Sequence, residues 1–224
     1  MIRHLFFPGL LDTGPVFGPV QTVRDGFMNL YVLKATGGLV CFDAGWRPAT
    51  VARGFEALGW NPRDVATVFL THLHWDHARS TGLFRNAEVF VGEHEIPAQV
   101  PKWLKPAKRL TGVTEGQRLS AAGISVRVLE TPGHTSGSVS YLADDRLLFS
   151  GDVIRLRQGE ALPFPFWFNR DSRALARSVR KLAGLNGIEC LLTGHNGFTA
   201  DVANAFRRWR EPAMDRLRQE GSRT

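Results

Sequence analysis

The chain has 224 residues, of which 43% are hydrophobic and 22% are charged. These values are typical of a soluble globular protein, and the length predicts one domain over residues 1–224. No apolar run approaches the roughly 20 residues that a membrane span needs. Pro8, Gly9 and Asp12 break the N-terminal apolar run before it resembles a signal-peptide core, so we expect a cytoplasmic protein with no membrane partner.

The net charge of +7 invites a nucleic-acid hypothesis, but no zinc-finger, helix-turn-helix or RNA-binding pattern is present. The positive charge is divided among 102–109, 155–157 and a C-terminal run in which acidic residues are interleaved. We therefore expect solvated surfaces or an anionic small-molecule substrate, and no nucleic acid. Cys41 and Cys190 each lie in an apolar run and are expected to be buried, unpaired thiols.

In the first half of the chain, strand-like and helix-like segments alternate. Strands are predicted at 29–35 and 39–45, and the turn signal Gly37-Gly38 between them predicts a hairpin. Residues 48–60 have apolar side chains at helical spacing after Pro48, which predicts a helix. The elements predicted next are a buried strand at 64–71, a short helix from about residue 77 and a strand at 87–92.

The second half continues this alternation. The predicted elements are a strand at 123–131, a hairpin over 137–152 that turns at Asp144-Asp145, a helix at 172–185 and a strand at 188–195. A final helix is predicted to begin near Thr199, to kink or restart at Pro212, and to dock an apolar stripe onto the core. The stripe consists of Val202, Phe206, Trp209, Ala213 and Leu217. The whole pattern favours an α/β fold in which two sheets pack together with helices outside.

Residue types that bind metals follow the predicted buried strands. The segment "THLHWDH" places four of them directly after the strand at 64–71: His72, His74, Asp76 and His77. Three more follow later strands, each directly after a glycine, in "PGH", "SGD" and "TGH": His134, Asp152 and His195. Ligands from several strands converge most readily at strand ends, and glycine lets the backbone turn sharply beside them.

The spacing of these residues suits two metal ions. His72 and His74 can aim their imidazoles at one point, which His134 completes. A second point is served by Asp76, His77 and His195. The Asp152 carboxylate can bridge the two points, and imidazole and carboxylate are ligands that Zn²⁺ accepts. We therefore predict two zinc ions, with iron or manganese as alternatives. Two such ions can hold a bridging hydroxide, and Asp76 or Asp152 can handle the proton.

These motifs resemble the metallo-β-lactamase superfamily. The matching segments are "THLHWDH", "TPGHTSGS", "FSGD" and "TGH", in the family's order, over roughly residues 29–200. The resemblance implies an αβ/βα four-layer sandwich, with two mixed β-sheets flanked by helices and a two-metal site at one edge. It implies the same ligand assignment as the spacing does. It also implies that Asp43, in "CFDAG", supports the site from behind the ligands.

Because this superfamily performs several reactions, the motifs alone do not settle the activity. Asp152 disfavours β-lactamases with a cysteine ligand, and His74 disfavours flavo-diiron proteins. Hydroxyacylglutathione thioesterases are similar in "HWDHA" and "HTSG", but they bind glutathione with a C-terminal helical domain, for which we expect the 29 residues after His195 to be too few. Acyl-homoserine lactonases are similar in length, but they have a tyrosine where Arg155 stands.

The favoured activity is hydrolysis, in which a metal-bound hydroxide attacks an ester, thioester or lactone. The alternative is a mononuclear-iron thiol or persulfide dioxygenase, a group that the chain resembles in "TPGHTSGSVSYL". Those enzymes leave part of the ligand set idle, whereas this chain keeps all seven candidates.

Three segments are expected to line the substrate cleft. Residues 7–20 read as an ordered Gly/Pro-rich loop above the site, and 102–109 offer Trp103 with flanking cations. Residues 161–169 form a hydrophobic wall, the alternatives being core packing or the contact of a homodimer. The substrate-binding candidates are Arg155, Arg157, Phe164, Phe166 and Trp167. An apolar pocket with a cationic rim suits a small acyl compound that carries a negative group.

Overall fold

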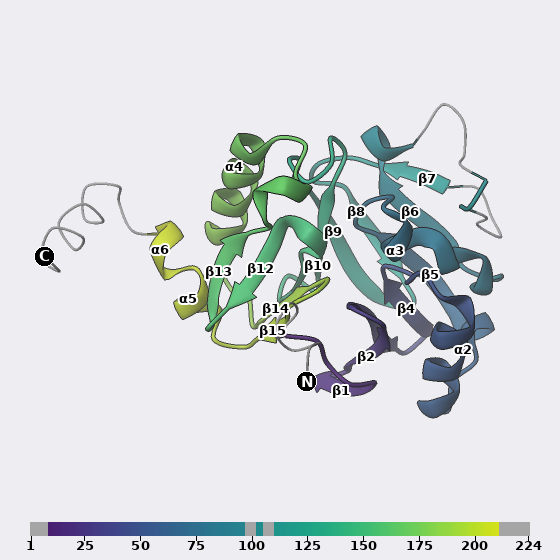
Figure 1. Cartoon of the computed structure of the whole chain (residues 1–224). Coiled ribbons are helices and arrows are strands. Elements are labelled where there is room, and N and C mark those ends of the chain that lie inside the picture. Colours follow the sequence, from purple (N-terminus) through teal and green to yellow (C-terminus); the bar gives the residue numbers. More distant parts are fainter. Residues whose placement is uncertain (1–8, 97–101, 105–109, 211–224) are drawn as a thin grey trace, which may run out of the picture.

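The structure is a computed structural model that describes residues 9–96, 102–104 and 110–210. Two mixed β-sheets pack face to face, and helices cover their outer faces (Figure 1). Helix α2 (Pro48–Ala57) packs on the first sheet and helix α4 (Ser172–Ala183) packs on the second. This order of helix, sheet, sheet and helix confirms the predicted αβ/βα sandwich.

The first sheet has seven strands that lie side by side in chain order. They are β1 (Gly14–Phe17), β2 (Val20–Asp25), β3 (Met28–Ala35), β4 (Gly38–Phe42), β5 (Val65–Leu70), β6 (Glu88–Gly92) and β7 (Leu110–Val113). Strands β1 to β4 are antiparallel, whereas β4 to β7 are parallel. The carboxyl ends of β4, β5 and β6 therefore lie at one edge of the sheet.

The second sheet has six strands in the order β15-β14-β11-β10-β9-β8. They are β8 (Arg118–Ala121), β9 (Ile124–Glu130), β10 (Val139–Ala143), β11 (Leu147–Phe149), β14 (Cys190–Thr193) and β15 (Gly197–Thr199). The pair β11 and β14 is parallel, and the other pairs are antiparallel. A separate two-stranded ribbon consists of β12 (Ile154–Arg157) and β13 (Glu160–Pro163).

The other helices of the described residues are short. They are α3 (Trp75–Ala78), α5 (Val202–Ala205), α6 (Arg207–Arg210) and the 3-10 turns η1 (Pro62–Asp64), η2 (Arg79–Leu83), η3 (Glu93–Glu95), η4 (Gly151–Val153) and η5 (Phe166–Phe168). The longest helix, α4, begins at Asp171, whose carboxylate accepts hydrogen bonds from the backbone N–H groups of Arg173 and Ala174. Within the described ranges, no helix has both the length and the apolar character that crossing a membrane requires.

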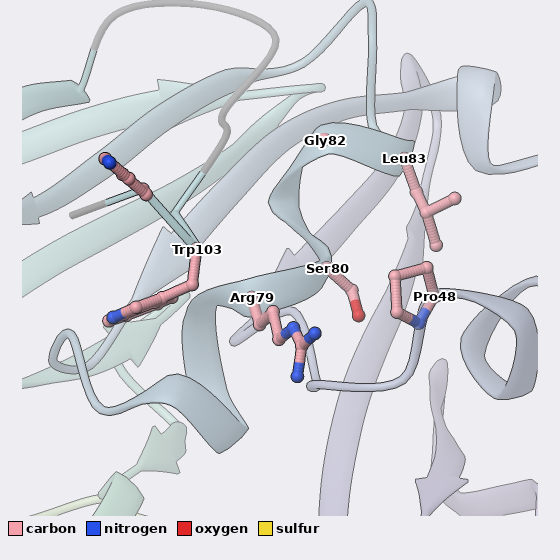
Figure 2. Close-up of a pocket in the computed structure, with 7 residues that line it drawn as sticks. Pro48, Arg79, Ser80, Gly82, Leu83 and Trp103 are labelled. Carbon is pink, nitrogen blue, oxygen red and sulfur yellow. The ribbon is translucent and has the colours of Figure 1, made fainter. Parts of the chain in front are cut away.

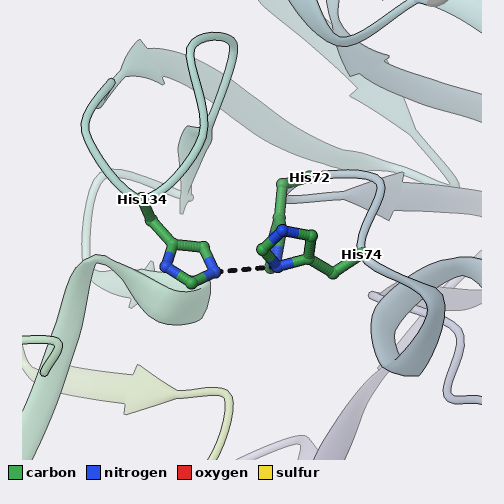
Figure 3. Close-up of side chains that lie close together, drawn as sticks. All are labelled: His72, His74 and His134. Carbon is green, nitrogen blue, oxygen red and sulfur yellow. Dashed lines mark hydrogen bonds between the residues drawn. The ribbon is translucent and has the colours of Figure 1, made fainter. Parts of the chain in front are cut away.

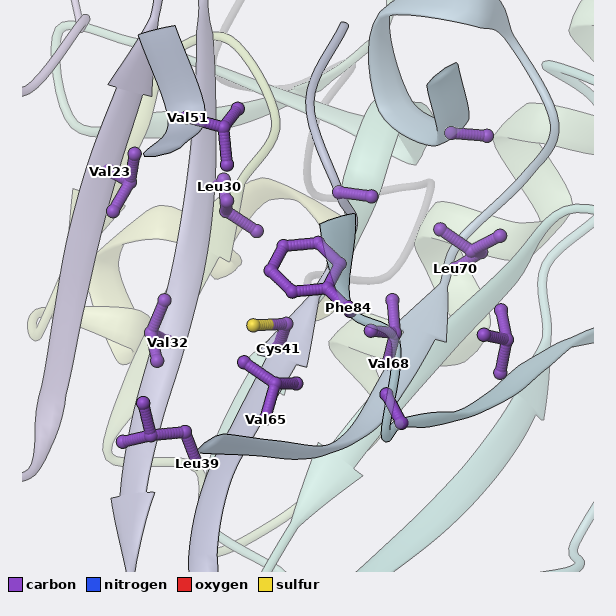
Figure 4. Close-up of a cluster of buried hydrophobic side chains, with 14 of the residues drawn as sticks. Val23, Leu30, Val32, Leu39, Cys41, Val51, Val65, Val68, Leu70 and Phe84 are labelled. Carbon is purple, nitrogen blue, oxygen red and sulfur yellow. The ribbon is translucent and has the colours of Figure 1, made fainter. Parts of the chain in front are cut away.

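Alternation along the strands separates the core into three layers. On β3, for example, Leu30 and Val32 face helix α2, while Tyr31 and Leu33 face the second sheet. Figure 4 shows the outer cluster of the first sheet, in which Phe84 lies among side chains from several strands. A third cluster packs α4 against the outer face of the second sheet.

The layer between the sheets is built around aromatic rings. Phe42 and Phe69 come from the first sheet, and Tyr141 and Phe149 come from the second. The rings of Phe42 and Phe149 stack with centroids 3.6 Å apart and planes at 5°. Phe42 also lies 5.5 Å from Phe69 and 6.1 Å from Tyr141, so one side chain contacts both sheets at their centre.

Most of the elements predicted from the sequence are confirmed. The hairpin β3–β4, the turn at Asp144-Asp145 and the elements corresponding to 48–60, 64–71, 87–92, 123–131, 172–185 and 188–195 are all present, and these last six are each one to four residues shorter than predicted. Both cysteines are buried and unpaired. The final helix is divided into α5 and α6, and Ala213, Leu217 and Pro212 lie outside the described residues.

The prediction that residues 7–20 form a loop was wrong. Residues 14–17 form the edge strand β1, which pairs antiparallel with β2 beginning at Val20. The error arose because Gly and Pro were read as loop residues, whereas an edge strand tolerates Pro15 on its unpaired side. Residues 7 and 8 lie outside the described part of the chain.

We expect Phe42→Ala to lower the free energy of unfolding by about 3–5 kcal/mol, because the cavity would open between both sheets. Urea denaturation followed by circular dichroism measures this change. The matched control is Phe166→Ala: that ring is 71% exposed, and its removal should change stability by less than about 0.5 kcal/mol. Equal losses in the two variants would contradict the assignment of Phe42 to the core.

Candidate metal centre

Seven side chains that were predicted as ligands converge at one edge of the sandwich. His72, His74, Asp76 and His77 follow β5 and continue into α3. The other three follow three strands of the second sheet: His134 after β9, Asp152 in η4 after β11, and His195 after β14. Loops from both sheets therefore meet at this edge, and the site exists only where the two sheets are packed together.

The first group consists of His72, His74 and His134 (Figure 3). His74 Nδ1 lies 3.0 Å from His72 Nε2 and 2.9 Å from His134 Nε2. The three rings stand nearly perpendicular to one another, at 79° to 88°, so three nitrogens face one small volume. Three converging imidazole nitrogens are a donor set that Zn²⁺ accepts.

The second group consists of Asp76, His77 and His195. His77 Nε2 lies 3.3 Å from His195 Nε2. Asp76 Oδ2 lies 3.5 Å from His195 Nε2 and 3.9 Å from His77 Nε2. Two nitrogens and one carboxylate oxygen thus converge beside the first group.

Asp152 lies between the two groups. Its Oδ2 is 3.5 Å from His134 Nε2 and 3.2 Å from His195 Nε2, while its Oδ1 is 3.5 Å from His77 Nε2. The side chain is only 5% exposed, and Oδ1 has no hydrogen-bond partner. A buried carboxylate oxygen without a partner is costly unless a cation is near. The donor set and this oxygen therefore fit a metal ion.

The first group is kept in the form that binds metals. Burial lowers the pKa of His72 well below its ordinary value, and the neighbouring His77 and His134 lower it further. Burial also lowers the pKa of His74 and of His134. These three imidazoles are therefore neutral near pH 7, and a neutral imidazole offers a lone pair to a metal.

The second group lies in a negative electrostatic environment. Burial by itself lowers the pKa of His77, but the carboxylates of Asp152, Asp43 and Asp76 together raise it well above its ordinary value. Burial raises the pKa of Asp152, yet His195 and His77 hold that pKa well below its usual range. Carboxylates thus stabilise positive charge at this position, whether a proton or a metal ion carries it.

Hydrogen bonds behind the ligands fix their rings. His77 Nδ1 lies 2.8 Å from Asp43 Oδ2, and Asp43 Oδ1 accepts from the backbone N–H of Thr71 at 2.8 Å. His195 Nδ1 donates to the carbonyl of Phe27 at 2.7 Å, and His134 Nδ1 lies 3.2 Å from Asn169 Oδ1. Each bond occupies Nδ1 and leaves Nε2 directed into the site.

Backbone conformation also serves the site at several positions. Asp43 has a φ of 64°, a left-handed conformation that Asp tolerates better than most residues. Gly151, before Asp152, has a φ of 52°. At Gly194, a Cβ atom would lie 2.6 Å from Asp152 Oδ1 and 2.9 Å from His77 Cε1. The glycine before His195 therefore keeps bulk away from two ligand side chains, as the sequence pattern suggested.

Sequence reasoning missed three supporting residues. Glu95 accepts hydrogen bonds from the backbone N–H of Leu73 at 2.8 Å and of Gly137 at 3.1 Å, and so ties together the loops that carry the first group. Asn169 and Phe27 are the others. A contact through a backbone carbonyl, as at Phe27, leaves no signal in the sequence. Glu95 stands beside His94, which is exposed and outside the cluster.

The predicted substrate-binding residues divide into two sets. Phe164 is 8% exposed and packs edge-on against His134 at 5.2 Å and tilted against His195 at 5.6 Å. Phe166 and Trp167, on η5, are 71% and 67% exposed. Phe164 therefore lies against two of the candidate ligands, whereas no ring contact among the described residues joins Phe166 or Trp167 to them.

The two arginines of β12 differ in how far they are buried. Arg155 is half-buried with an unpaired Nε, and Arg157 is exposed. Among the described residues, neither makes a hydrogen bond or ion pair with the ligand cluster. Trp103 lines a separate cavity beside η2 and α2. The rest of the predicted segment 102–109, residues 105–109, lies outside the described part of the chain.

Comparison with known proteins places these features in one family. A family model described as "Metallo-beta-lactamase superfamily" matches residues 23–195. The hydroxyacylglutathione hydrolase of Rhodospirillum rubrum is 29% identical over an alignment that covers 92% of this chain and 78% of that protein. The hydroxyacylglutathione hydrolase-like protein of Mus musculus is 32% identical over 60% of this chain. The chain spans 46% of the mouse protein's length.

Solved structures show the same architecture. A metallo-beta-lactamase family protein of Thermus thermophilus superposes with a TM-score of 0.64 at 26% identity, covering 96% of this chain and 82% of that one. A metallo-beta-lactamase of Cronobacter sakazakii superposes with a TM-score of 0.69 at 18% identity, covering 99% and 97% of the two chains, and shows the shared fold alone. With the family match extending from β2 to His195, the chain belongs to the metallo-β-lactamase superfamily, as a metal-dependent hydrolase.

Proposed function

We propose that this protein is a dinuclear metal hydrolase that cleaves an ester, thioester or lactone carrying an anionic group. The observation that supports it most is the position of Asp152, whose two carboxylate oxygens lie 3.2–3.5 Å from imidazoles of both ligand groups. A thioester is the first choice, because several relatives are named hydroxyacylglutathione hydrolases.

In this proposal His72, His74 and His134 hold one ion, Asp76, His77 and His195 hold the other, and Asp152 bridges them. Zinc is the favoured metal for these nitrogen and oxygen donors, with iron or manganese as alternatives. When bound, such ions supply a Lewis acid for a carbonyl oxygen and lower the pKa of water to about 7.

The protein's own residues supply proton transfer and positioning. Asp76 is the more accessible of the two candidate proton carriers, at 13% side-chain exposure against 5% for Asp152, and its Oδ2 can take up and return a proton. Phe164 covers His134 and His195 and limits the access of bulk water. Phe166 and Trp167 offer exposed apolar surface to an acyl group.

We expect purified protein to contain two zinc ions per chain and to hydrolyse a thioester, with activity lost on chelation and restored by zinc. Elemental analysis measures the metal, and the assay panel contains thioesters, lactones, phosphodiesters and glutathione persulfide. One iron per chain with oxygen consumption on the persulfide would overturn the proposal in favour of the dioxygenase.

A pair of histidine variants controls this experiment. His74→Ala removes the nitrogen that faces both other members of the first group and should lower kcat/KM by at least about 100-fold. His94→Ala, at an exposed histidine in the same part of the chain, should leave kcat/KM unchanged.

We expect Asp43→Asn to weaken metal binding about 10–100-fold, because the amide keeps the shape of the side chain but removes the charge facing His77 Nδ1. Titration against a chromophoric chelator measures the affinity. Asp144→Asn is the matched control: Asp144 also has a positive φ, of 47°, but lies in an exposed turn. Equal metal affinities for the Asp43 variant and the wild type would remove Asp43 from the proposed site.

We expect Arg155→Ala to raise KM at least about tenfold for anionic thioesters and to leave KM for a neutral thioester nearly unchanged. The half-buried guanidinium, with an unpaired Nε, is the group proposed to face the substrate's negative charge. Arg118→Ala is the control, because Arg118, on β8, already pairs with Asp145. Equal increases of KM for both substrates would contradict the role.

A further inference from the structure

A cavity of about 420 Å³ lies apart from the candidate metal centre, and none of the seven candidate ligands lines it (Figure 2). Its walls come from the start of α2, from η2 and from the segment 102–104. Pro48, Leu83 and Trp103 give it an apolar lining, and Arg79, Ser80 and Lys102 give it a polar one. Its size lies within the range of about 300–1,000 Å³ that is typical of small-ligand sites.

The Ser80 hydroxyl has no hydrogen-bond partner in this cavity. Ser80 is 1% exposed, and its Oγ is buried and unpaired, although its backbone N–H donates to the carbonyl of Gly45 at 2.9 Å. Figure 2 shows the hydroxyl pointing between Arg79 and the ring of Pro48. Buried hydroxyl groups are nearly always hydrogen-bonded, so an unpaired one that lines a cavity indicates a missing acceptor.

The charged residues of the cavity indicate what kind of acceptor this is. Arg79 and Lys102 are both exposed, and neither side chain makes an ion pair or hydrogen bond with another residue that the structure describes. Among the described residues that line the cavity, none is acidic. Two cations and one hydroxyl donor therefore face the same space, and a guanidinium is suited to bind two oxygens of a carboxylate or phosphate.

The apolar lining indicates the remainder of the ligand. Trp103 is half-buried and forms one wall, with Leu83 and Pro48 on the opposite side in Figure 2. A flat apolar group can stack on an indole ring while its anionic end reaches the cations. We propose that this cavity is a second binding site, for a small organic anion that joins an aryl or similar apolar body to a carboxylate or phosphate.

This site differs from the substrate site of the proposed hydrolase, and the inference does not depend on that activity. The two sites are nevertheless linked through the backbone. Arg79 and Ser80 directly follow α3, which carries Asp76 and His77, and the carbonyl of His77 accepts from the N–H of Ala44 at 2.7 Å. An occupant of the cavity would therefore stabilise the segment that presents the second ligand group.

Isothermal titration calorimetry on the metal-loaded protein tests the proposal, with benzoate, phenyl phosphate and the neutral benzyl alcohol as probes. We expect one of the two anions to bind at least about tenfold more tightly than benzyl alcohol, and the stronger anion identifies the carboxylate or the phosphate class. Arg79→Gln should weaken that binding at least about tenfold. Arg85→Gln, which makes the same charge change at an exposed arginine outside the lining, should not.

Ser80→Ala gives an independent measurement. Because the hydroxyl is unpaired, its removal should leave the thermal unfolding midpoint of the ligand-free protein unchanged or higher, while the stabilisation by the anion falls. A lowered midpoint without ligand would show that the hydroxyl has a structural role and would overturn the assignment. Anion binding that persists in Arg79→Gln and competes with the hydrolysed substrate would overturn it too, by placing the anion at the metal centre.

Discussion

The buried carboxylate of Asp152 needs positive charge beside it, and the rest of the site is arranged around that need. It lies among three imidazoles, with one oxygen unpaired, where an ionised group is stable only beside positive charge. The raised pKa of His77 and of His195 follows from the same carboxylate field. The same atoms would stabilise a proton or a metal ion, so a metal ion that bound at the second group would displace protons. The first group, whose imidazoles have lowered pKa values, has no such competition near neutral pH.

The contacts behind the ligands explain why this arrangement requires the whole fold. The ring of His77 is fixed by Asp43 from the end of β4, and the ring of His195, after β14, is fixed by the carbonyl of Phe27 before β3. The first sheet thus fixes His77, which follows one of its own strands, and also His195, which follows a strand of the second sheet. The stacking of Phe42 on Phe149 between the sheets holds them in the relative position that the bond between His195 and Phe27 needs. A metal ion that bound here would therefore stabilise the packing of the two sheets, and loss of that packing would weaken metal binding.

The sequence was most informative where a residue type and its position both carried a signal. Long buried strands such as 64–71 could be predicted, and so could the polar residues directly after them, because parallel strands end at one edge. Strands of three or four residues, such as β7, β12 and β15, are too short to show alternation, and β1 was misread because Gly and Pro indicate loops. Glu95 and Asn169 could not be predicted. Each acts through a contact between segments distant in the chain, and a single polar residue in a loop does not indicate its partner.

Asn169 connects Phe164, in the segment proposed to line the substrate site, to a candidate metal ligand. Its Oδ1 lies 3.2 Å from His134 Nδ1, and its Nδ2 donates to the carbonyl of Phe164 at 2.7 Å. The ring of Phe164 in turn packs against His134 and His195. A change that displaced Phe164 would therefore also move the amide of Asn169, which orients His134. Because misplacement of a ligand-supporting group weakens metal binding, the segment has little freedom near Phe164 and Asn169. The exposed rings of Phe166 and Trp167 have no such link among the contacts described, so substitutions there would leave the orientation of the candidate ligands unchanged.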